Sequence, residues 1–380
     1  MAKFKEIEAL YIHIPFCNNI CTYCDFYKMM ARQDAKSKYI DYLIRELDLK
    51  LKYLSSIKTI YIGGGTPTSL DNELLEKLFK AIEERINLNK VKEYSIEANP
   101  LDLDINKTNL LNKYHINRVS IGVQSFNDAR LKFLGRNHNM LDVINAINNL
   151  RNSGIENINI DLIYGLPDDT FSKFKKDLKQ AVRLKVNHIS SYALILEEHT
   201  MLYNLFKEGK FSELDGDIQA NIYYKTNKYL AKHGYNHYEI SNYAINGYES
   251  IHNLTYWNNE YYLAIGASGS YYLDNTRYTN INNLKKYYEG IDNNHLEYLE
   301  ENKLSTKDQM AEEVILGLRK VEGLDTNRFK DKFDKSIYEV FGDIINDLVN
   351  KKLLVLTKNN HLKIPKDKLF VSNSIMERFI

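Results

Sequence analysis

Three cysteines lie within eight residues of one another, and the chain has no others: Cys17, Cys21 and Cys24. A secreted disulfide scaffold would use an even number spread along the sequence, whereas clustered thiolates are typical of soft-metal sites. Two metal sites are compatible with this pattern. The cysteines could hold three irons of a [4Fe-4S] cluster and leave the fourth iron open, or hold zinc with His13 as the fourth ligand. The C-x3-C-x2-C spacing favours the cluster, because zinc modules usually show two ligand pairs separated by a longer loop.

Further polar residues stand where apolar runs end. A glycine run, Gly63 to Gly65, follows the second run, and it matches neither the dinucleotide fingerprint nor a phosphate loop. Asp161 interrupts the apolar stretch NINIDLI. A carboxylate inside such a stretch is costly unless it exchanges hydrogen bonds, so Asp161 is a candidate ligand-binding residue.

The elements that position these residues follow from alternating patterns in the first 200 residues. Amphipathic segments such as 35–54, 72–86 and 140–153 separate short runs rich in β-branched and aromatic residues. Those runs are 9–14, 59–62, 94–98, 118–123, 157–163 and 188–196. Strands alternating with helices predict βαβ units and a parallel sheet. We therefore expect an α/β fold, an incomplete barrel of six βα units, with chemistry at the carboxyl ends of its strands.

The pattern divides the chain into three parts. Residues 1–200 form the predicted partial barrel, and residues 201–304, rich in Tyr, Asn and Gly, are expected to cover its mouth. Residues 305–380 show two helical segments and two short apolar runs around Lys358-Asn359-Asn360, which resembles a winged-helix module.

Composition excludes several classes of protein. The 51 basic and 50 acidic residues give a net charge of +1, too little to steer nucleic acid to the surface. No apolar run approaches the roughly 18 residues of a membrane helix, and the N-terminus lacks a signal-like apolar segment. We therefore expect a cytoplasmic protein with at most peripheral membrane contact.

The segment YIHIPFCNNICTYCDF resembles the signature of the radical S-adenosylmethionine (SAM) superfamily. The strings IGGGTPT, GVQSFN, DLIYGLP, YEISNYA and HNLTYW resemble oxygen-independent coproporphyrinogen oxidases and the related HemW-type haem chaperones. The resemblance implies a cluster on the three cysteines whose open iron takes the amino and carboxylate groups of SAM. It also implies cofactor contacts from Tyr11, Tyr23, Asp25, Gly64, Gly65, Thr66, Glu97, Gln124, Arg136, Asp161 and Ala193.

Two features favour the chaperone branch over the oxidase. Phe26 stands where the similar oxidases carry another cysteine, and only 16 residues precede the first cluster cysteine. The oxidase and a zinc-stabilised binding protein remain the alternatives. The chaperone resemblance implies haem as ligand and acceptor haem proteins, such as respiratory enzymes, as partners.

The string HNLTYW is the candidate haem site. Imidazole is a common haem ligand and aromatic rings suit its faces, so we predict His252 as ligand and Tyr256 and Trp257 as walls. Asn253 is expected to orient the imidazole. The competing ligands are His233, His237 or a cysteine when the cluster is absent. Relatives often carry a histidine near the position of Ser270, and this chain has none there.

Overall fold

The computed structural model describes residues 6–380, and a twelve-stranded sheet runs through most of them. The order of its strands is β12-β11-β10-β9-β1-β2-β3-β4-β5-β6-β8-β7. All six strands predicted from the first 200 residues are present and pair in parallel. They are β1 (Ala9–Ile14), β2 (Thr59–Gly64), β3 (Glu93–Ala98), β4 (Arg118–Gln124), β5 (Asn157–Tyr164) and β6 (His188–Ala193). The sheet is open rather than closed, which confirms the incomplete barrel.

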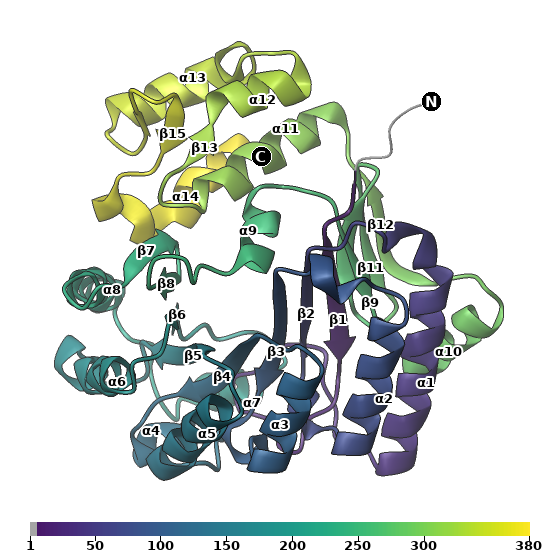
Figure 1. The fold of residues 1–380 in the computed structure, drawn as a ribbon. Helices are drawn as coiled ribbons and strands as arrows, with labels where there is room; N and C mark the ends of the chain where they lie inside the picture. The colour runs from purple at the N-terminus through teal and green to yellow at the C-terminus, as the bar shows by residue number, and fades with distance from the viewer. Residues whose placement is uncertain (1–5) are drawn as a thin grey trace.

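Helices cover the outer face of the parallel strands (Figure 1). They are α1 (Gln33–Leu49), α2 (Asn72–Glu83), α3 (Ile105–Lys113), α4 (Asp128–Phe133), α5 (Met140–Asn152) and α6 (Phe171–Arg183). Side chains cap several of their first turns: Asp71 caps α2, Asp104 caps α3 and Thr170 caps α6. Such caps satisfy amide groups that the helix itself leaves without partners, and so they define where each helix begins.

The two faces of the parallel strands differ in polarity. Residues such as Ile12, Ile60 and Ile121 point outward and are fully buried under the helices. The alternate residues point into the barrel, and most are polar, as Tyr11 and Asp161 illustrate. A period of two residues is what a strand requires to separate its faces in this way. The outer face therefore holds the core, and the inner face is available for chemistry.

Residues 201–304 do not form the single cover that we expected. Helix α7 (Met201–Lys207) does lie beside the cysteine loop, where Leu202 N donates to Thr22 O at 2.8 Å. Helix α8 (Gly216–Ala231) packs on α6, while β7 (Asn236–Glu239) and β8 (Asn242–Ala244) extend the sheet beyond β6. Helix α9 (Ile251–Trp257) lies at the opposite end of the strands, against the first residues of β2 and β3.

The remainder of this part widens the other edge of the sheet. Strand β9 (Tyr262–Ile265) pairs in parallel with β1. The sequence pattern predicts a strand near 261–272, but not that it is a seventh parallel strand of the barrel. The antiparallel strands are β10 (Ser270–Leu273), β11 (Thr276–Asn280) and β12 (Tyr298–Lys303), and α10 (Leu284–Asp292) packs against α1.

The C-terminal part is a small helical module with a three-stranded sheet of order β13-β15-β14. Its elements are α11 (Thr306–Leu318), β13 (Leu324–Asp325), α12 (Thr326–Phe333), α13 (Ile337–Asn350), β14 (Val355–Leu356), β15 (His361–Lys363) and α14 (Ser372–Met376). The two predicted helices and the hairpin are present, and α12 is an additional helix. The module lies beyond the amino ends of the parallel strands. In Figure 1 the β1 arrow points downward, and the module is at the top.

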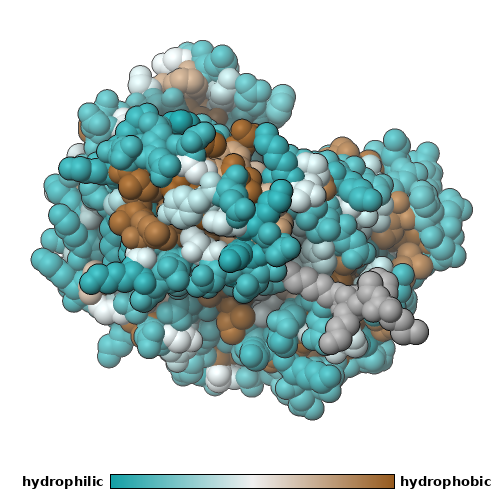
Figure 2. Space-filling view, turned by 90° about the horizontal axis from the view of Figure 1, so that it is seen from above, coloured by the Kyte–Doolittle hydropathy of each residue, from teal (hydrophilic) through white to brown (hydrophobic). Residues whose placement is uncertain are grey.

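Seen from that side, the surface is mainly hydrophilic with scattered apolar side chains (Figure 2). Among residues 6–380, no helix combines the length and the apolar character that crossing a bilayer requires.

Candidate functional site

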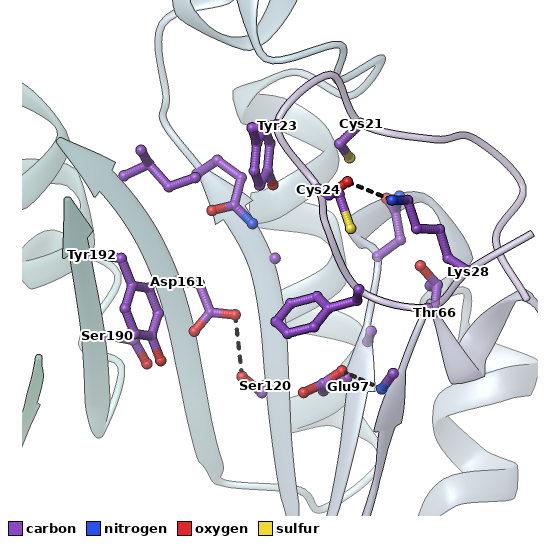
Figure 3. Close-up of a pocket in the computed structure, with 18 of the residues that line it drawn as sticks. Cys21, Tyr23, Cys24, Lys28, Thr66, Glu97, Ser120, Asp161, Ser190 and Tyr192 are labelled. Atoms are coloured by element: carbon purple, nitrogen blue, oxygen red, sulfur yellow. Dashed lines mark hydrogen bonds between the residues drawn. The ribbon is translucent and has the colours of Figure 1, made fainter. Parts of the chain in front are cut away.

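A cavity of about 370 Å³ opens at the carboxyl ends of the parallel strands, beneath the loop that follows β1. All three cysteines line it, and Figure 3 shows Cys21 and Cys24 on the loop across from Asp161, Ser190 and Tyr192 on the strands. Most of the predicted cofactor residues line the same cavity: Tyr23, Asp25, Gly64, Gly65, Thr66, Glu97, Gln124, Arg136, Asp161 and Ala193. Tertiary folding thus gathers residues from seven separate stretches of sequence.

The cysteine loop is held at both ends by backbone hydrogen bonds. Cys17 N donates to Met29 O at 3.0 Å, and Met29 N donates to Pro15 O at 2.7 Å. At the tip of the loop, Thr22 N donates to Leu134 O at 3.2 Å. The glycine loop packs so closely underneath that a Cβ on Gly65 would lie 2.8 Å from Phe16 O and 2.9 Å from Cys17 Sγ.

Cationic and hydroxyl groups surround the thiols. Arg136 Nη1 donates to Cys21 Sγ at 3.4 Å, and Thr66 Oγ1 donates to Cys17 Sγ at 3.6 Å. The Lys28 ammonium donates to the carbonyl of Cys24 (Figure 3). Burial raises the pKa of Cys17, and it raises the pKa of Cys24 to about 11. Bound iron would offset that cost, because metal coordination stabilises the thiolate form.

Within residues 6–380, no three His, Cys, Asp or Glu side chains surround one point as ligands of a single metal ion. The thiols share a cavity wall, which suits a polynuclear group in which each thiolate binds a different iron. His13, the zinc ligand of the alternative site, has both ring nitrogens engaged. Its Nδ1 lies 3.1 Å from Tyr11 Oη, and its Nε2 donates to Tyr27 O at 3.1 Å.

Glu97 ties the glycine loop to the barrel. Gly64 N donates to its Oε2 at 3.0 Å, and Tyr61 Oη donates to its Oε1 at 2.9 Å. Burial raises the pKa of this carboxyl to about 7. Gly64 has a φ of +117°, and a Cβ there would lie 2.7 Å from the His13 ring. The glycine is therefore required by the chain itself, in addition to any ligand.

Asp161 receives a hydrogen bond from Asn159 Nδ2 at 2.8 Å and a longer one from Ser120 Oγ at 3.4 Å. Burial raises the pKa of this carboxyl. These contacts leave acceptor capacity facing the cavity, where hydroxyl groups of a ligand would bind.

Gln124 and Arg136 depend on an irregularity in β4. The register of β4 against β5 shifts between Gly122 and Gln124, and Gln124 adopts a φ of +66°. Bulges of this kind redirect side chains next to functional sites. Here the shift exposes the Gly122 carbonyl, which accepts a hydrogen bond from Arg136 Nη2.

Tyr11 is the predicted SAM-binding residue that does not line the cavity. It lies inside the barrel, and its hydroxyl is bound to His13. Sequence reasoning in turn missed several cavity-lining residues on the inner face, among them Tyr61, Arg118 and His188. Their alternation with buried Ile60, Val119 and Ile189 was the signal that could have identified them.

The string HNLTYW forms α9, which closes the other end of the barrel. Glu93, the first residue of β3, accepts hydrogen bonds from Ile251 N at 2.8 Å and His252 N at 3.2 Å. His252 is fully buried, and its ring stacks on Tyr61 with centroids 5.2 Å apart. Its Nδ1 lies 2.9 Å from Thr59 Oγ1, and its Nε2 lies 2.7 Å from Tyr256 Oη. In this arrangement His252 has no nitrogen free for iron.

The predicted haem residues face different spaces. Asn253 lines the cavity that contains the cysteines. Tyr256 and Trp257 instead line a groove of about 600 Å³ between α9 and α11. His233 and His237 line neither space, and Ser270 is exposed on β10, where its Oγ lies 3.0 Å from Thr279 Oγ1.

Two family models and several curated proteins match this chain. The radical SAM superfamily model matches residues 11–181, and the HemN C-terminal domain model matches residues 304–364. The heme chaperone HemW of Lactococcus lactis is 41% identical over 99% of this chain and 98% of its own length. The chain belongs to the HemW family. A second HemW, from Bacillus subtilis, is 38% identical over 92% of the chain and 93% of its own length.

The fold of this HemW-family chain is also that of a solved oxidase. Coproporphyrinogen III oxidase (HemN) from Escherichia coli superposes with a TM-score of 0.85 and 23% identity, covering 100% of this chain and 91% of the oxidase. At that identity the match shows a shared fold. HemW-family membership agrees with the chaperone resemblance of the sequence motifs.

Proposed function

We propose that this chain is a cytoplasmic haem chaperone that binds a [4Fe-4S] cluster, SAM and haem, and passes haem to acceptor haem proteins. The observation that carries the proposal is the similarity over nearly the whole length to proteins named heme chaperone HemW. Respiratory haem proteins are the first acceptors to test.

Cys17, Cys21 and Cys24 are the proposed cluster ligands. When bound, the cluster would supply an open iron for the cofactor and a single electron. The donor set fits such a group, because three thiols face one cavity with Arg136 and Lys28 beside them. The guanidinium and the ammonium would stabilise the negative charge of the thiolates.

The glycine loop, Glu97 and Asp161 are the proposed SAM contacts nearest to the thiols. Glu97 already holds Gly64, so this carboxylate sets the position of the loop against which the cofactor would lie. Asp161 offers acceptors for the ribose hydroxyls from the facing wall. Gln124, Arg136 and Ala193 complete that wall. Tyr11 would act indirectly, through His13.

Haem binding by α9 is the part of the proposal that requires a structural change. For His252 to bind iron through Nε2, that atom must leave Tyr256 Oη. The Tyr256→Phe variant removes this competitor and keeps the ring. If His252 is the ligand, Y256F should bind haem at least as tightly as the wild type, while His252→Ala should bind more weakly and with an altered absorption spectrum.

The test is a haem titration of anaerobically reconstituted protein, followed by transfer to an apo-cytochrome b. Saturable haem binding and transfer to the apo-cytochrome are expected. Absence of both in protein with a full complement of iron and sulfide would refute the chaperone function. An unchanged spectrum and affinity in H252A would assign the iron to another ligand.

Coproporphyrinogen oxidation is the second candidate, because the chain shares its whole fold with HemN. Phe26, which lines the cavity where the similar oxidases carry a cysteine, argues against it. Reconstituted and reduced protein should therefore leave coproporphyrinogen unchanged with SAM present. Conversion at enzyme-like rates would move the chain to the oxidase class.

A further inference from the structure

The cavity continues inward beyond the residues assigned to the cluster and SAM. Its inner part is lined by Arg118 and His188, the first residues of β4 and β6, and by Asn159 and Ser190. Ser250 and Asn253, at the start of α9, line it as well. These residues come from the amino ends of the strands, so the cavity reaches most of the way through the barrel.

Arg118 is a buried cation in this inner part. The residue is only 3% exposed, and its Nε has no hydrogen-bond partner. Nη1 donates to the neutral amide oxygen Oδ1 of Asn157 at 3.1 Å. Among the residues that the structure describes, no carboxylate forms an ion pair with this guanidinium.

The charged and titratable neighbours of Arg118 have other partners. His188 contacts Asn159 Oδ1 at 2.6 Å and Tyr238 Oη at 2.8 Å, and burial lowers its pKa, so the ring is neutral. Asp161, farther along the same wall, is bound by Asn159 and Ser120. Asp161 interacts favourably with the guanidinium at longer range, but the two side chains form no ion pair.

Two other arginines of the molecule show the usual arrangement. Arg130, which is also largely buried, forms two hydrogen bonds with Asp169, at 2.8 and 3.1 Å. Arg277 is paired with Glu312 at 2.7 Å. Burying a charge without a counter-ion is costly, and an anion bound in the cavity would offset that cost.

We propose that Arg118 anchors a carboxylate-binding subsite in the inner part of the cavity. A guanidinium is suited to this role because its planar set of donors matches the two oxygens of a carboxylate. Two ligands could supply the group. One is a propionate of haem held from the cavity side of α9, which rests on the proposed function. The other is the carboxylate of SAM, whose binding here would mean that the open iron does not hold it.

Three variants test the subsite in the reconstituted full chain. Arg118→Gln removes the positive charge. Arg118→Lys keeps the charge but lacks the planar set of donors. Asn157→Asp places a carboxylate at the atom that Nη1 already contacts, so the protein would supply its own counter-ion. Arg45→Gln, at an exposed arginine paired with Asp292, is the control for loss of a positive charge. Thermal unfolding shows that each variant is folded, and iron content shows that it contains the cluster.

The probes are two matched pairs: haem with haem dimethyl ester, and SAM with decarboxylated SAM. If a haem propionate occupies the subsite, R118Q and N157D should weaken haem binding by about tenfold and leave the diester unchanged. If SAM is the source, the same loss should appear with SAM and not with its decarboxylated form. R118K should give an intermediate loss.

N157D separates this proposal from a purely structural role. It should raise the midpoint of thermal unfolding because it supplies the missing counter-ion, and yet it should lower the affinity for the carboxylate ligand. Affinities within about twofold of the wild type for haem and SAM in both R118Q and N157D would overturn the subsite. Wild-type protein that binds no haem would refute the proposed function instead. The affinities for SAM and decarboxylated SAM would then be the only test of the subsite.

Discussion

The two ends of the barrel are built from the same alternating strands, yet one end is a cavity and the other is closed. At the carboxyl ends, Glu97 and Asp161 keep acceptor atoms toward an open space. At the amino ends, the polar atoms of Glu93, Thr59 and His252 are bound to one another and to α9. Polar side chains alone therefore do not define a site, and what matters is whether the protein already supplies their partners.

Tyr61 connects these two regions. Its hydroxyl donates to Glu97 at the cavity, while its ring stacks on His252 beneath α9. Variants at the open end should mainly affect ligands, and variants at the closed end should mainly affect stability. The following predictions test that difference.

Loss of any cluster cysteine should give the largest effect. Changing Cys17, Cys21 or Cys24 to Ala should abolish the four-iron signal, because the chain has no other thiol to replace the lost ligand. Iron and sulfide analysis with electron paramagnetic resonance of the reduced protein measures this. Reconstitution of the same cluster in the triple variant would contradict the assignment.

Gly65→Val should also lower cluster content strongly. Its Cβ would lie within 2.9 Å of Cys17 Sγ and 2.8 Å of Phe16 O, so the cysteine loop must move. Asp161→Ala is the contrasting variant at the same open end. It should keep its iron and weaken SAM binding about fivefold, the value of one neutral hydrogen bond, as calorimetry would measure. A G65V protein with normal iron content would show that the loop tolerates the side chain.

At the closed end, His252→Ala should destabilise the apoprotein by about 3 kcal/mol, because it removes a buried ring and leaves polar partners unsatisfied. Urea unfolding of apoprotein, without cluster or haem, measures this directly. D161A, compared in the same way, should lose less stability, because burial disfavours the charged form of the carboxyl that it removes. Equal loss of stability in both variants would erase the distinction between the two ends.

Glu97 should make stability depend on pH. Its pKa is raised from 4.5 to about 7 in the folded protein. Between these pH values the folded state therefore keeps a proton that the unfolded state has already released. Wild-type stability should therefore fall as the pH rises from 4.5 to 7. The advantage of Glu97→Gln should grow over that range to roughly 3 kcal/mol and then level off. A constant difference from pH 5 to 8 would show that the carboxyl titrates normally.

Ser270→His should have the smallest effect. Ser270 is exposed on β10 and lines neither the cavity nor the groove, so the histidine should leave SAM and haem affinities unchanged. A gain of more than about threefold in haem affinity would bring this strand into the haem site.

The sequence predicted the barrel strands well because each carries a strong local signal. Runs such as 118–123 are short, β-branched and alternating, and they recur between amphipathic helices. Strand β9 was missed as a barrel strand because its four residues are separated by about 250 residues from β1, with which it pairs. The position of α9 was predicted wrongly, since nothing local indicates which end of a barrel a helix will reach.

The sequence by itself determined the cysteine loop, the glycine loop and the family to which the chain belongs, because spacing and order along the chain are enough to specify them. Only the tertiary structure decided which polar residues face the open cavity. Glu93 and Glu97 lie four residues apart on the same face of β3, and yet one anchors a helix while the other faces the cavity. His252 was predicted from the sequence as a ligand residue, whereas Arg118 was not. Their partners come from distant segments, so only the folded chain shows that His252 is satisfied and that Arg118 is not.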